Sequence, residues 1–391
     1  MWTVQEAILP PKITVIVGWF QIAWSTLVAA AHSFFRHHAL KCCSVPSETL
    51  GVLQTFYQKV DSIQRVRMDY HQGMQLDLPV LLHEFRNRSS TDPRDKIFAL
   101  LGLVMRDPKY HALRADYTLS AEEVYKKAFI SLLQATGNLN LLVRQLEVGR
   151  TLDLPTWIPD WTAKVDQLKA DLHDYLRRNL HVYNTSCSTQ PDIRWPDITT
   201  TLGVKGLLFD EIATLAEPDP NPHAITDSYI AYLKTLFNST GRQSQLYIGG
   251  GDFSHAFWRL IIMDMILVYS DDSVRGWPQR STLEDYRKYT DTLSPAKKSN
   301  QLLLMLPGFR FFITKMGYIG LGPENMRIGD TVHVFQGGSV PFVLRQATQQ
   351  TVFSRRETGY QYVGNCYVQG IMDGEALQGV DLSELDWVNL V

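Results

Sequence analysis

Residues 91–103 constrain the fold more than any other stretch of this sequence. Asp92 followed by Pro93 is a strong helix start, because aspartate accepts hydrogen bonds from free backbone N–H groups and proline suits the first helical turn. The apolar face that follows at helical spacing consists of Ile97, Leu100, Leu101 and Val104. The stretch therefore predicts a helix that packs one face into a protein core.

The composition is that of a globular protein able to build such a core, with 391 residues, 45% hydrophobic and 20% charged. A formal net charge of -2 offers no basic excess for binding phosphates, so no nucleic-acid partner is expected. The cysteines show no CxxC or Cys/His zinc spacing, and the adjacent pair is a poor disulfide. They are Cys42, Cys43, Cys187 and Cys366. A reducing compartment is therefore predicted, and with it a cytoplasmic location.

Residues 13–31 carry no charge and approach the length of a membrane span, about 20 residues. Polar residues dilute the apolar character of this segment, and Gly18 divides it. We favour a buried strand over residues 13–17 and a helix from about Trp19 over a membrane-spanning segment. Membrane association is thus not expected, although an anchored accessory protein stays an alternative.

Further helices are predicted from caps and periodicity, over residues 3–9, 47–70, 78–86 and 121–135. Ser120 followed by Glu123 resembles a capping box at the start of the last of these. Residues 154–161 are rich in tryptophan and proline and read as extended. Residues 164–200 look polar and loosely packed.

Beyond residue 200 we expect a strand pair over 202–212 with turns at Gly203 and Gly206, then a mainly helical stretch over 215–315. From Gly317 the apolar period changes to two, which predicts an antiparallel sheet or small barrel. Its expected strands are 331–335, 340–344 and 360–368. The predicted fold class is α+β, with mostly helical N-terminal and middle regions followed by a small C-terminal antiparallel β module.

Several sequence blocks stand in a fixed order along the chain. They are Trp2 to Glu6, Thr91 to Leu103, Asp116-Tyr117, Val124-Tyr125, Leu154 to Trp161, Gly317 to Arg345, Tyr362 to Gly364 and Tyr367 to Glu375. This ordered set, which covers essentially the whole chain, resembles the fungal heterokaryon-incompatibility (HET) proteins. The residues that carry the family motifs are Trp2, Gln5, Asp92, Pro93, Asp95, Lys96, Gly102, Trp157, Pro159, Asp160, Trp161, Gly329, Asp330, Gly370, Asp373, Gly374 and Glu375.

The resemblance also implies a domain organisation. The opening strand of the HET signature domain is missing, so residues 1–40 are interpreted as a C-terminal remnant of that domain in an N-terminally truncated protein. A helical region over 41–162, a mixed and mainly helical region over 163–316, and the β module over 317–391 are expected to follow.

For function, the resemblance implies non-self recognition, with programmed cell death when incompatible hyphae fuse, or an accessory role beside a secondary-metabolite gene cluster. In this form the chain is expected to be a non-catalytic interaction module without a cofactor. Its expected partners are other proteins, a full-length HET-type relative among them. The proposed binding surfaces are its helical middle and its β module.

The alternative function is enzymatic and centres on Glu6. HET domains resemble TIR domains, whose NAD-cleaving members carry a glutamate four residues after a tryptophan. Trp2 and Glu6 have this spacing, which places them on one helical face. A carboxylate there could stabilise positive charge on a ribose as nicotinamide departs, provided that upstream residues complete the site. Under the other interpretation, Glu6 is a surface residue of the helix.

The remaining candidates have simpler structural interpretations. The charged residues 92–96 favour capping and ion pairing over an active site. Residues 373–375 favour a turn over a calcium loop, and Gly249 to Gly251 a flexible connection over a phosphate loop. The tryptophans of 154–161 favour stapling of domains over docking of a peptide. His32, His37 and His38 lack ligand-spaced partners in the sequence, so no metal site is predicted.

Overall fold

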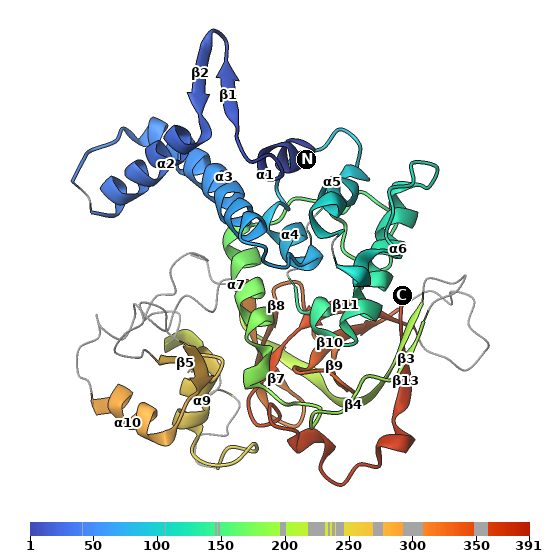
Figure 1. The fold of residues 1–391 in the computed structure, drawn as a ribbon. Helices are drawn as coiled ribbons and strands as arrows, with labels where there is room; N and C mark the ends of the chain where they lie inside the picture. The colour runs from blue at the N-terminus through green and yellow to red at the C-terminus, as the bar shows by residue number, and fades with distance from the viewer. Residues whose placement is uncertain are drawn as a thin grey trace. The chain divides into compact units, whose positions relative to one another are not determined.

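The computed structural model describes residues 1–391 except 41, 106, 145–146, 148, 196–200, 218–230, 234, 237–238, 240–245, 269–276, 292–307 and 348–358. The chain divides into two compact units, residues 1–135 and 136–391, and each is described by itself. Helices dominate the first unit and a large sheet dominates the second (Figure 1). The predicted α+β class with a C-terminal β module is confirmed.

The first unit is a helical body from which one β-hairpin projects. Its elements are α1 (Thr3–Ile8), β1 (Thr14–Val17), β2 (Phe20–Ala23), α2 (Trp24–Ala39), α3 (Ser47–His71), α4 (Leu78–Glu84), α5 (Asp95–Val104), the 3-10 helix η1 (Pro108–Tyr110) and α6 (Ala121–Thr136). Helix α5 is the centre of the core, because all its residues from Lys96 to Val104 except Gly102 are buried.

Of the two helix starts predicted from capping residues, the start of α6 is confirmed and the start of α5 is shifted. At α6 the capping box is present, since the Ser120 N–H donates to Glu123 at 2.7 Å and the Glu123 N–H donates to the Ser120 hydroxyl at 3.2 Å. At α5 the regular helix begins at Asp95, later than expected. Asp92 instead accepts the Arg94 N–H at 2.9 Å, and its carbonyl accepts the Asp95 N–H in a tight turn ahead of the helix.

The prediction for residues 13–31 is partly wrong. The chain forms a hairpin, β1–β2, before helix α2 begins at Trp24, not at Trp19. Gly18 occupies the turn with φ +59°, a left-handed conformation that favours glycine. Most of the hairpin is exposed, not buried. Among the described helices, none has the length and apolar character to span a membrane.

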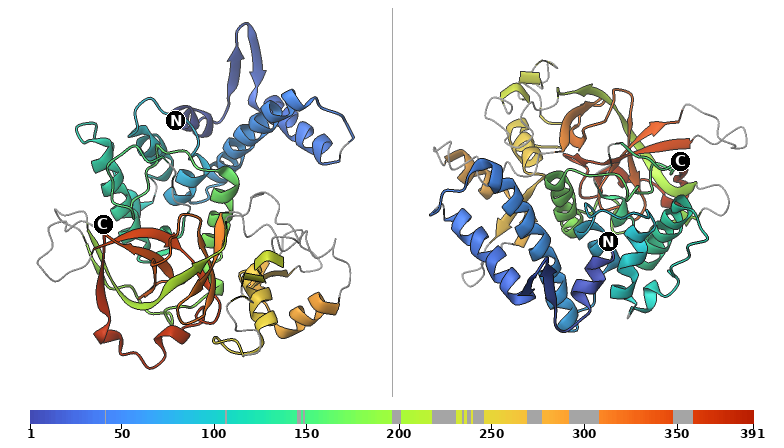
Figure 2. Two further views of the ribbon diagram at one scale, coloured as in Figure 1. Left: turned by 180° about the vertical axis from the view of Figure 1, so that it is seen from behind. Right: turned by 90° about the horizontal axis from the view of Figure 1, so that it is seen from above.

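The second unit is built on a barrel. Its strands are β3 (Ile193–Arg194), β4 (Leu202–Leu215), β7 (Phe309–Thr314), β8 (Ile319–Pro323), β9 (Thr331–Phe335), β10 (Phe342–Gln346), β11 (Gly359–Asn365), β12 (Tyr367–Val368) and β13 (Asp386–Leu390). Along the ring β4 pairs with β13, β13 with β11, β11 with β10, β10 with β9, and β9 with β4 again. The ring is therefore closed, and two views show β4 curving around it (Figure 2).

The core of the barrel is apolar on the inner faces of these strands. Its buried cluster comprises Ile212, Phe312, Met326, Val332, Val334, Val343, Val363, Cys366, Val368, Ile371, Leu377 and Leu385. The far end of β4 pairs with β7, which pairs with β8 and then β12, so that β4 belongs to the ring and to its extension. Among the described strands of this sheet, β11 and β13 pair in parallel and the other pairs are antiparallel.

The structure corrects three expectations for the second unit. Residues 202–215 form one long strand, because Gly203 and Gly206 lie within β4 and not in turns. Residues 164–195 contain helix α7 (Gln167–Arg178), the 3-10 helix η3 (Leu180–Val182) and β3. The stretch 215–315 contains α9 (Phe253–Ile261) and α10 (Leu283–Asp291), but also the strands β5 (Met265–Val268), β6 (Trp277–Arg280) and β7. Much of that stretch lies outside the described residues.

Short 3-10 helices complete the second unit. They are η2 (Asn140–Leu142), η5 (Glu375–Leu377) and η6 (Leu382–Glu384). The last two lie between β12 and β13, so they connect the extension of the sheet to the closed ring.

Candidate protein-interaction site

Helix α1, which carries Glu6, is fixed to its own unit by contacts on its other faces. Val4 and Ile8 are buried, whereas Glu6 is exposed. Arg67 of α3 donates to carbonyls in the last turn of α1 and just beyond it, including Ala7 at 3.0 Å and Pro11 at 2.8 Å. The guanidinium thereby satisfies carbonyl groups that the short helix leaves free. The exposed position of Glu6 agrees with its interpretation as a surface residue.

Two motif residues from distant blocks contact each other. A Cβ atom at Gly102 in α5 would lie 2.7 Å from Nε2 of Gln5 in α1. Glycine at this position therefore lets the side chain of Gln5 lie against α5. Trp2 is the N-cap residue that precedes α1 and is 43% exposed.

The charged residues 92–96 form a structural clamp. Arg94 binds the Asp92 carboxylate, with Nη2–Oδ2 at 2.7 Å, and donates to the carbonyls of Tyr117 and Leu119 at 2.7 and 2.9 Å. The hydrogen bonds from Arg94 hold the pKa of Asp92 below its usual value. The Tyr117 hydroxyl donates to Asp95 at 2.6 Å. The arrangement matches capping and ion pairing, as the sequence favoured.

The clamp also binds the hydroxyl groups of Tyr117 and Tyr125, which come from two neighbouring motif blocks. Burial, together with the hydrogen bond to Asp95, raises the pKa of Tyr117 to about 12. Tyr125 of α6, fully buried, donates its hydroxyl to the Pro93 carbonyl at 2.7 Å. The blocks around residues 92, 117 and 125 therefore form one contact network inside the first unit.

Lys96 anchors the other side of this network. Its ammonium donates to the Arg86 carbonyl at 3.0 Å and to the Arg88 carbonyl, and the residue is only 8% exposed. We expect Lys96→Met to lower the free energy of unfolding by about 2 kcal/mol, since hydrogen bonds to a charged group contribute about 1.5–3 kcal/mol. Urea titration of both proteins measures the loss. Lys127→Met, at an exposed position of α6, is the control. Equal stability of the two variants would contradict the anchoring role.

The Trp-Pro segment, residues 154–161, is an internal staple of the second unit. Trp157 is fully buried, and Trp161 is 5% exposed. Thr156 donates its N–H and its hydroxyl to the Val391 carbonyl at 3.0 and 2.6 Å, and its hydroxyl accepts the Tyr362 N–H at 2.7 Å. The segment thus binds the middle of β11 and the residue that follows β13. Its tryptophans are not available to dock a peptide.

Asp160 organises the turns on either side of this segment. Its buried carboxylate accepts backbone N–H groups from Thr151 at 2.8 Å, Leu152 at 3.2 Å and Thr162 at 2.9 Å. Burial alone raises the pKa of Asp160, but the hydrogen bonds from Thr162, Thr151 and Leu152 outweigh burial and leave the pKa below its usual value. Pro159, beside it, is buried as well.

The motif residues of the β module also have structural roles. Gly329 forms the turn before β9 with φ +91°, and Asp330 binds Arg345 through both carboxylate oxygens at 2.7 and 2.8 Å. Such a paired, buried carboxylate fixes the start of β9 against β10. Gly370 lies so close to the turn of residues 247–251 that a Cβ on it would meet Gly249 Cα at 2.7 Å.

Residues 249–251 are part of that tight turn and not a loose connection. Tyr247 donates its N–H to the Gly251 carbonyl at 3.0 Å and its hydroxyl to the Gln369 carbonyl at 2.6 Å. Farther along, Asp373 pairs with Arg280 at 2.5 Å and donates its N–H to Glu375 at 2.8 Å. Gly374, at φ +95°, precedes η5. Residues 373–375 are therefore a turn, as predicted.

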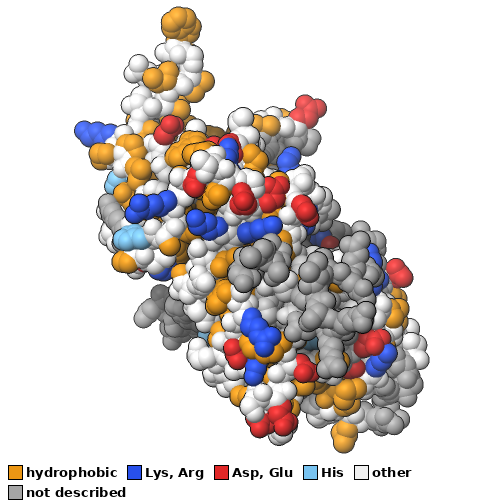
Figure 3. Space-filling model, turned by 90° about the vertical axis from the view of Figure 1, so that its right-hand side faces the viewer, with side chains coloured by type: hydrophobic (Ala, Val, Ile, Leu, Met, Phe, Trp, Pro, Cys, Tyr) orange, Lys and Arg blue, Asp and Glu red, His pale blue; other side chains and the backbone are white. Residues whose placement is uncertain are grey.

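The surface feature that none of these structural roles explains is the β1–β2 hairpin. Its exposed fractions are 66% at Ile16, 59% at Val17, 100% at Trp19 and 74% at Phe20. We call these four residues the hairpin surface. Figure 3 shows the projection ending in hydrophobic side chains, drawn in orange at its tip. A contiguous exposed apolar patch is typical of a binding site.

The backbone of the hairpin is also open to a partner. Among the described residues, β1 and β2 pair only with each other, from Thr14–Ala23 to Val17–Phe20. An edge strand without a neighbour can add a strand from another chain. The sequence did contain a signal for this site, since Gly18 separates two apolar runs as a hairpin turn would. This signal was not recognised, because the segment was expected to be buried.

Comparison with known proteins supports the fold. The Het-6 β-barrel domain family matches residues 279–384. The "Heterokaryon incompatibility protein 6, OR allele" of Neurospora crassa (strain ATCC 24698 / 74-OR23-1A / CBS 708.71 / DSM 1257 / FGSC 987) is 23% identical over 352 residues, which cover 73% of this chain and 49% of that protein. The chain thus spans about half the length of this relative. No solved structure matches it.

These findings agree with the barrel of the second unit, and they define the class of the protein. It is a protein with a Het-6 β-barrel domain. Both findings support a fungal protein of the heterokaryon-incompatibility type, the resemblance that the motif blocks indicated. Strands β4 and β13, which close the ring, lie outside the matched residues.

Proposed function

We propose that this chain acts in fungal non-self recognition as a non-catalytic interaction module, and that the hairpin surface is where it binds a partner protein. The proposal rests on the full exposure of Trp19, which lies beside the exposed Phe20. Both residues belong to a hairpin whose two strands pair with each other and with no other described strand. Burying a large apolar side chain contributes roughly 1.5–3 kcal/mol, so these two residues can supply a large part of a specific affinity. This location replaces the helical middle and the β module as the expected binding surface.

The proposed partner is a longer protein of the same type. The match covers 49% of the similar Neurospora protein, so a protein of that length offers surfaces outside the matched part. Binding in the cytoplasm would then couple recognition to cell death after hyphal fusion. An accessory role beside a secondary-metabolite gene cluster would use the same surface.

A fungal pairing experiment tests the role in incompatibility. Strains that carry Trp19→Ser and Phe20→Ser at the chromosomal locus are paired with tester strains that reject the parent. We expect stable heterokaryons in pairings where the parent strain gives cell death, because the partner no longer binds. Unchanged rejection in every pairing, at unchanged protein abundance, would refute the proposal.

The alternative function is NAD cleavage with Glu6 as the catalytic carboxylate. The exposed position of Glu6 on a helix whose other faces are packed favours the interaction module. We therefore expect the purified chain to release no nicotinamide from NAD, with Glu6→Ala identical to the parent. Chromatography of the reaction measures nicotinamide directly. Turnover that disappears in Glu6→Ala would instead establish the enzymatic alternative.

A further inference from the structure

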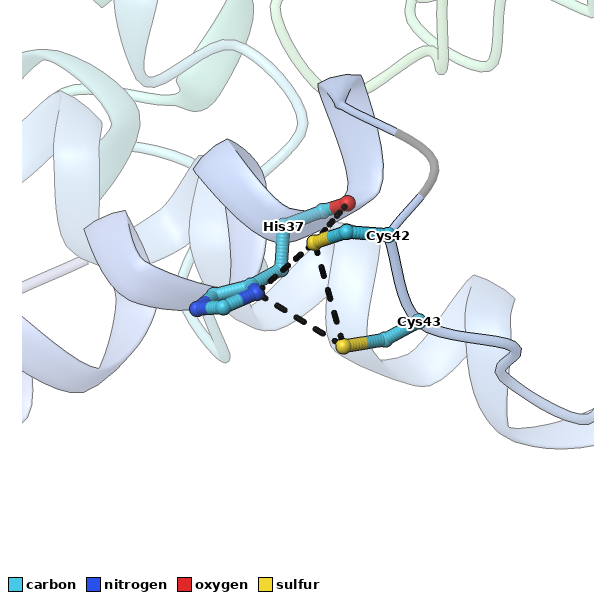
Figure 4. A group of neighbouring side chains, drawn as sticks. All are labelled: His37, Cys42 and Cys43. Carbon is cyan, nitrogen blue, oxygen red and sulfur yellow. Dashed lines mark hydrogen bonds between the residues drawn. The ribbon is translucent and has the colours of Figure 1, made fainter.

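Three potential metal ligands meet where helix α2 ends. Cys42 Sγ lies 2.9 Å from His37 Nδ1, Cys43 Sγ lies 3.6 Å from the same nitrogen, and the two sulfurs are 3.9 Å apart (Figure 4). The sequence predicted no metal ligand here, because adjacent cysteines and a histidine five residues away have no usual zinc spacing. The fold brings them together by turning the chain back, since the Cys42 N–H donates to the His37 carbonyl at 3.3 Å.

Two of these three separations match a tetrahedral metal site. With Zn–S near 2.3 Å and Zn–N near 2.0 Å, ligands at tetrahedral angles lie about 3.8 Å apart for two sulfurs and about 3.5 Å apart for sulfur and nitrogen. The distances between the sulfurs and from Cys43 to His37 agree with these values. The Cys42–His37 distance is that of a hydrogen bond, so it must lengthen by roughly 0.6 Å when a metal replaces the proton.

The helix dipole also favours a cation at this position, although the same turn carries the basic residues Arg36 and His38. The group lies at the carboxyl end of the 16-residue helix α2, where the helix dipole is negative. All three side chains are exposed, so an ion can enter without a change of fold.

We propose that His37, Cys42 and Cys43 bind one thiophilic d10 metal ion, such as Zn²⁺, with solvent in the fourth position. Binding replaces the two thiol protons with two metal–sulfur bonds, releases two protons to solvent, and uses the neutral His37 nitrogen as the third ligand. Because the residues join the end of α2 to the loop that leads to α3, the ion fixes the turn between these helices.

Cobalt spectroscopy on the full, reduced chain tests the site. Co²⁺ is added to the protein in the presence of a phosphine reductant, and the thiolate-to-cobalt charge-transfer band is recorded. We expect saturation at one ion per chain, displacement of the band by equimolar Zn²⁺, and release of two protons per ion. A chain that gives no charge-transfer band while remaining folded by circular dichroism would overturn the proposal.

Single variants separate this site from adventitious binding. Cys42→Ser, Cys43→Ser and His37→Ala are each expected to weaken Zn²⁺ binding by at least tenfold. His38→Ala and Cys187→Ser, which alter other exposed residues, should leave it unchanged. All five positions are on the surface, so the variants should fold like the parent. Equal loss in the control variants, or none in the ligand variants, would show that the ion binds elsewhere.

Discussion

Replacing Asp160 with alanine is expected to lower the free energy of unfolding of the barrel unit by about 4 kcal/mol. The change leaves the N–H groups of Thr151, Leu152 and Thr162 without their acceptor. A fully buried donor left without an acceptor costs about 1–3 kcal/mol, and these three hydrogen bonds are partly buried, so each loss lies toward the lower end of that range. The same turns position the fully buried Trp157, so the loss is expected to spread to the middle of β11 and to the end of β13. Denaturant unfolding followed by tryptophan fluorescence measures it.

The contribution of Asp160 to the free energy of unfolding should also depend on pH. The pKa of Asp160 is lower in the folded protein than the ordinary value of 3.8, so the ionised carboxylate stabilises the fold. That contribution is complete above the ordinary value and is lost as the pH falls through the lowered folded value. Asp160→Asn should therefore be clearly less stable than the parent at neutral pH, with a difference that shrinks in acid below about pH 4.

A nearby exposed acid provides the control for this pair of measurements. Asp153 lies in the same stretch of chain but is exposed, so Asp153→Asn should change stability by less than about 0.5 kcal/mol. If Asp160→Ala were no less stable than Asp153→Asn, the Trp-Pro segment would not be the staple described above.

The second large effect is expected in binding and not in stability. Trp19→Ser combined with Phe20→Ser should weaken binding to a full-length HET-type protein from the same fungus by more than roughly 100-fold. This corresponds to about 3 kcal/mol, as expected when two aromatic anchors are removed from an interface. Titration calorimetry measures the change in Kd. The melting temperature should stay the same, because these side chains are 100% and 74% exposed.

Ile328→Ser is the matched control for the double variant. Ile328 is also an exposed apolar residue, at 67%, but lies in the turn before β9. Its removal should leave the affinity unchanged. Equal affinities for all three proteins would place the interface elsewhere on the chain. Sedimentation of the parent with lipid vesicles, lost in the double variant, would assign the hairpin to membrane contact and contradict a protein partner.

Local signals predicted several elements well. The reciprocal bonds of Ser120 and Glu123 show why the start of α6 was predictable, since they depend only on residues three positions apart. Strand β9 was predicted with its observed bounds because alternating apolar residues lie between glycine turns. Features of this kind are encoded within one turn or one strand.

Long-range contacts explain the errors. Gly206 was predicted to be a turn residue, yet it lies in β4 beside Phe335, where a Cβ would approach Cδ1 to 2.7 Å. Only the closed barrel makes that contact apparent. Likewise, the motif residues Gln5 and Gly102 looked independent in the sequence, although they touch. The exposure of Trp19 is also a tertiary property, because an apolar run gives no sign that the rest of the unit leaves it uncovered.

Site-specific photo-cross-linking tests the central claim most directly. Trp19 is replaced by a photoreactive phenylalanine derivative, and the chain is irradiated with a full-length HET-type protein from the same fungus. A derivative at Ile328 serves as the comparison. The hairpin-binding account predicts a cross-linked pair from position 19, mapped by mass spectrometry to the partner, and none from position 328. No cross-link from position 19, or equal yields from both positions, would contradict it.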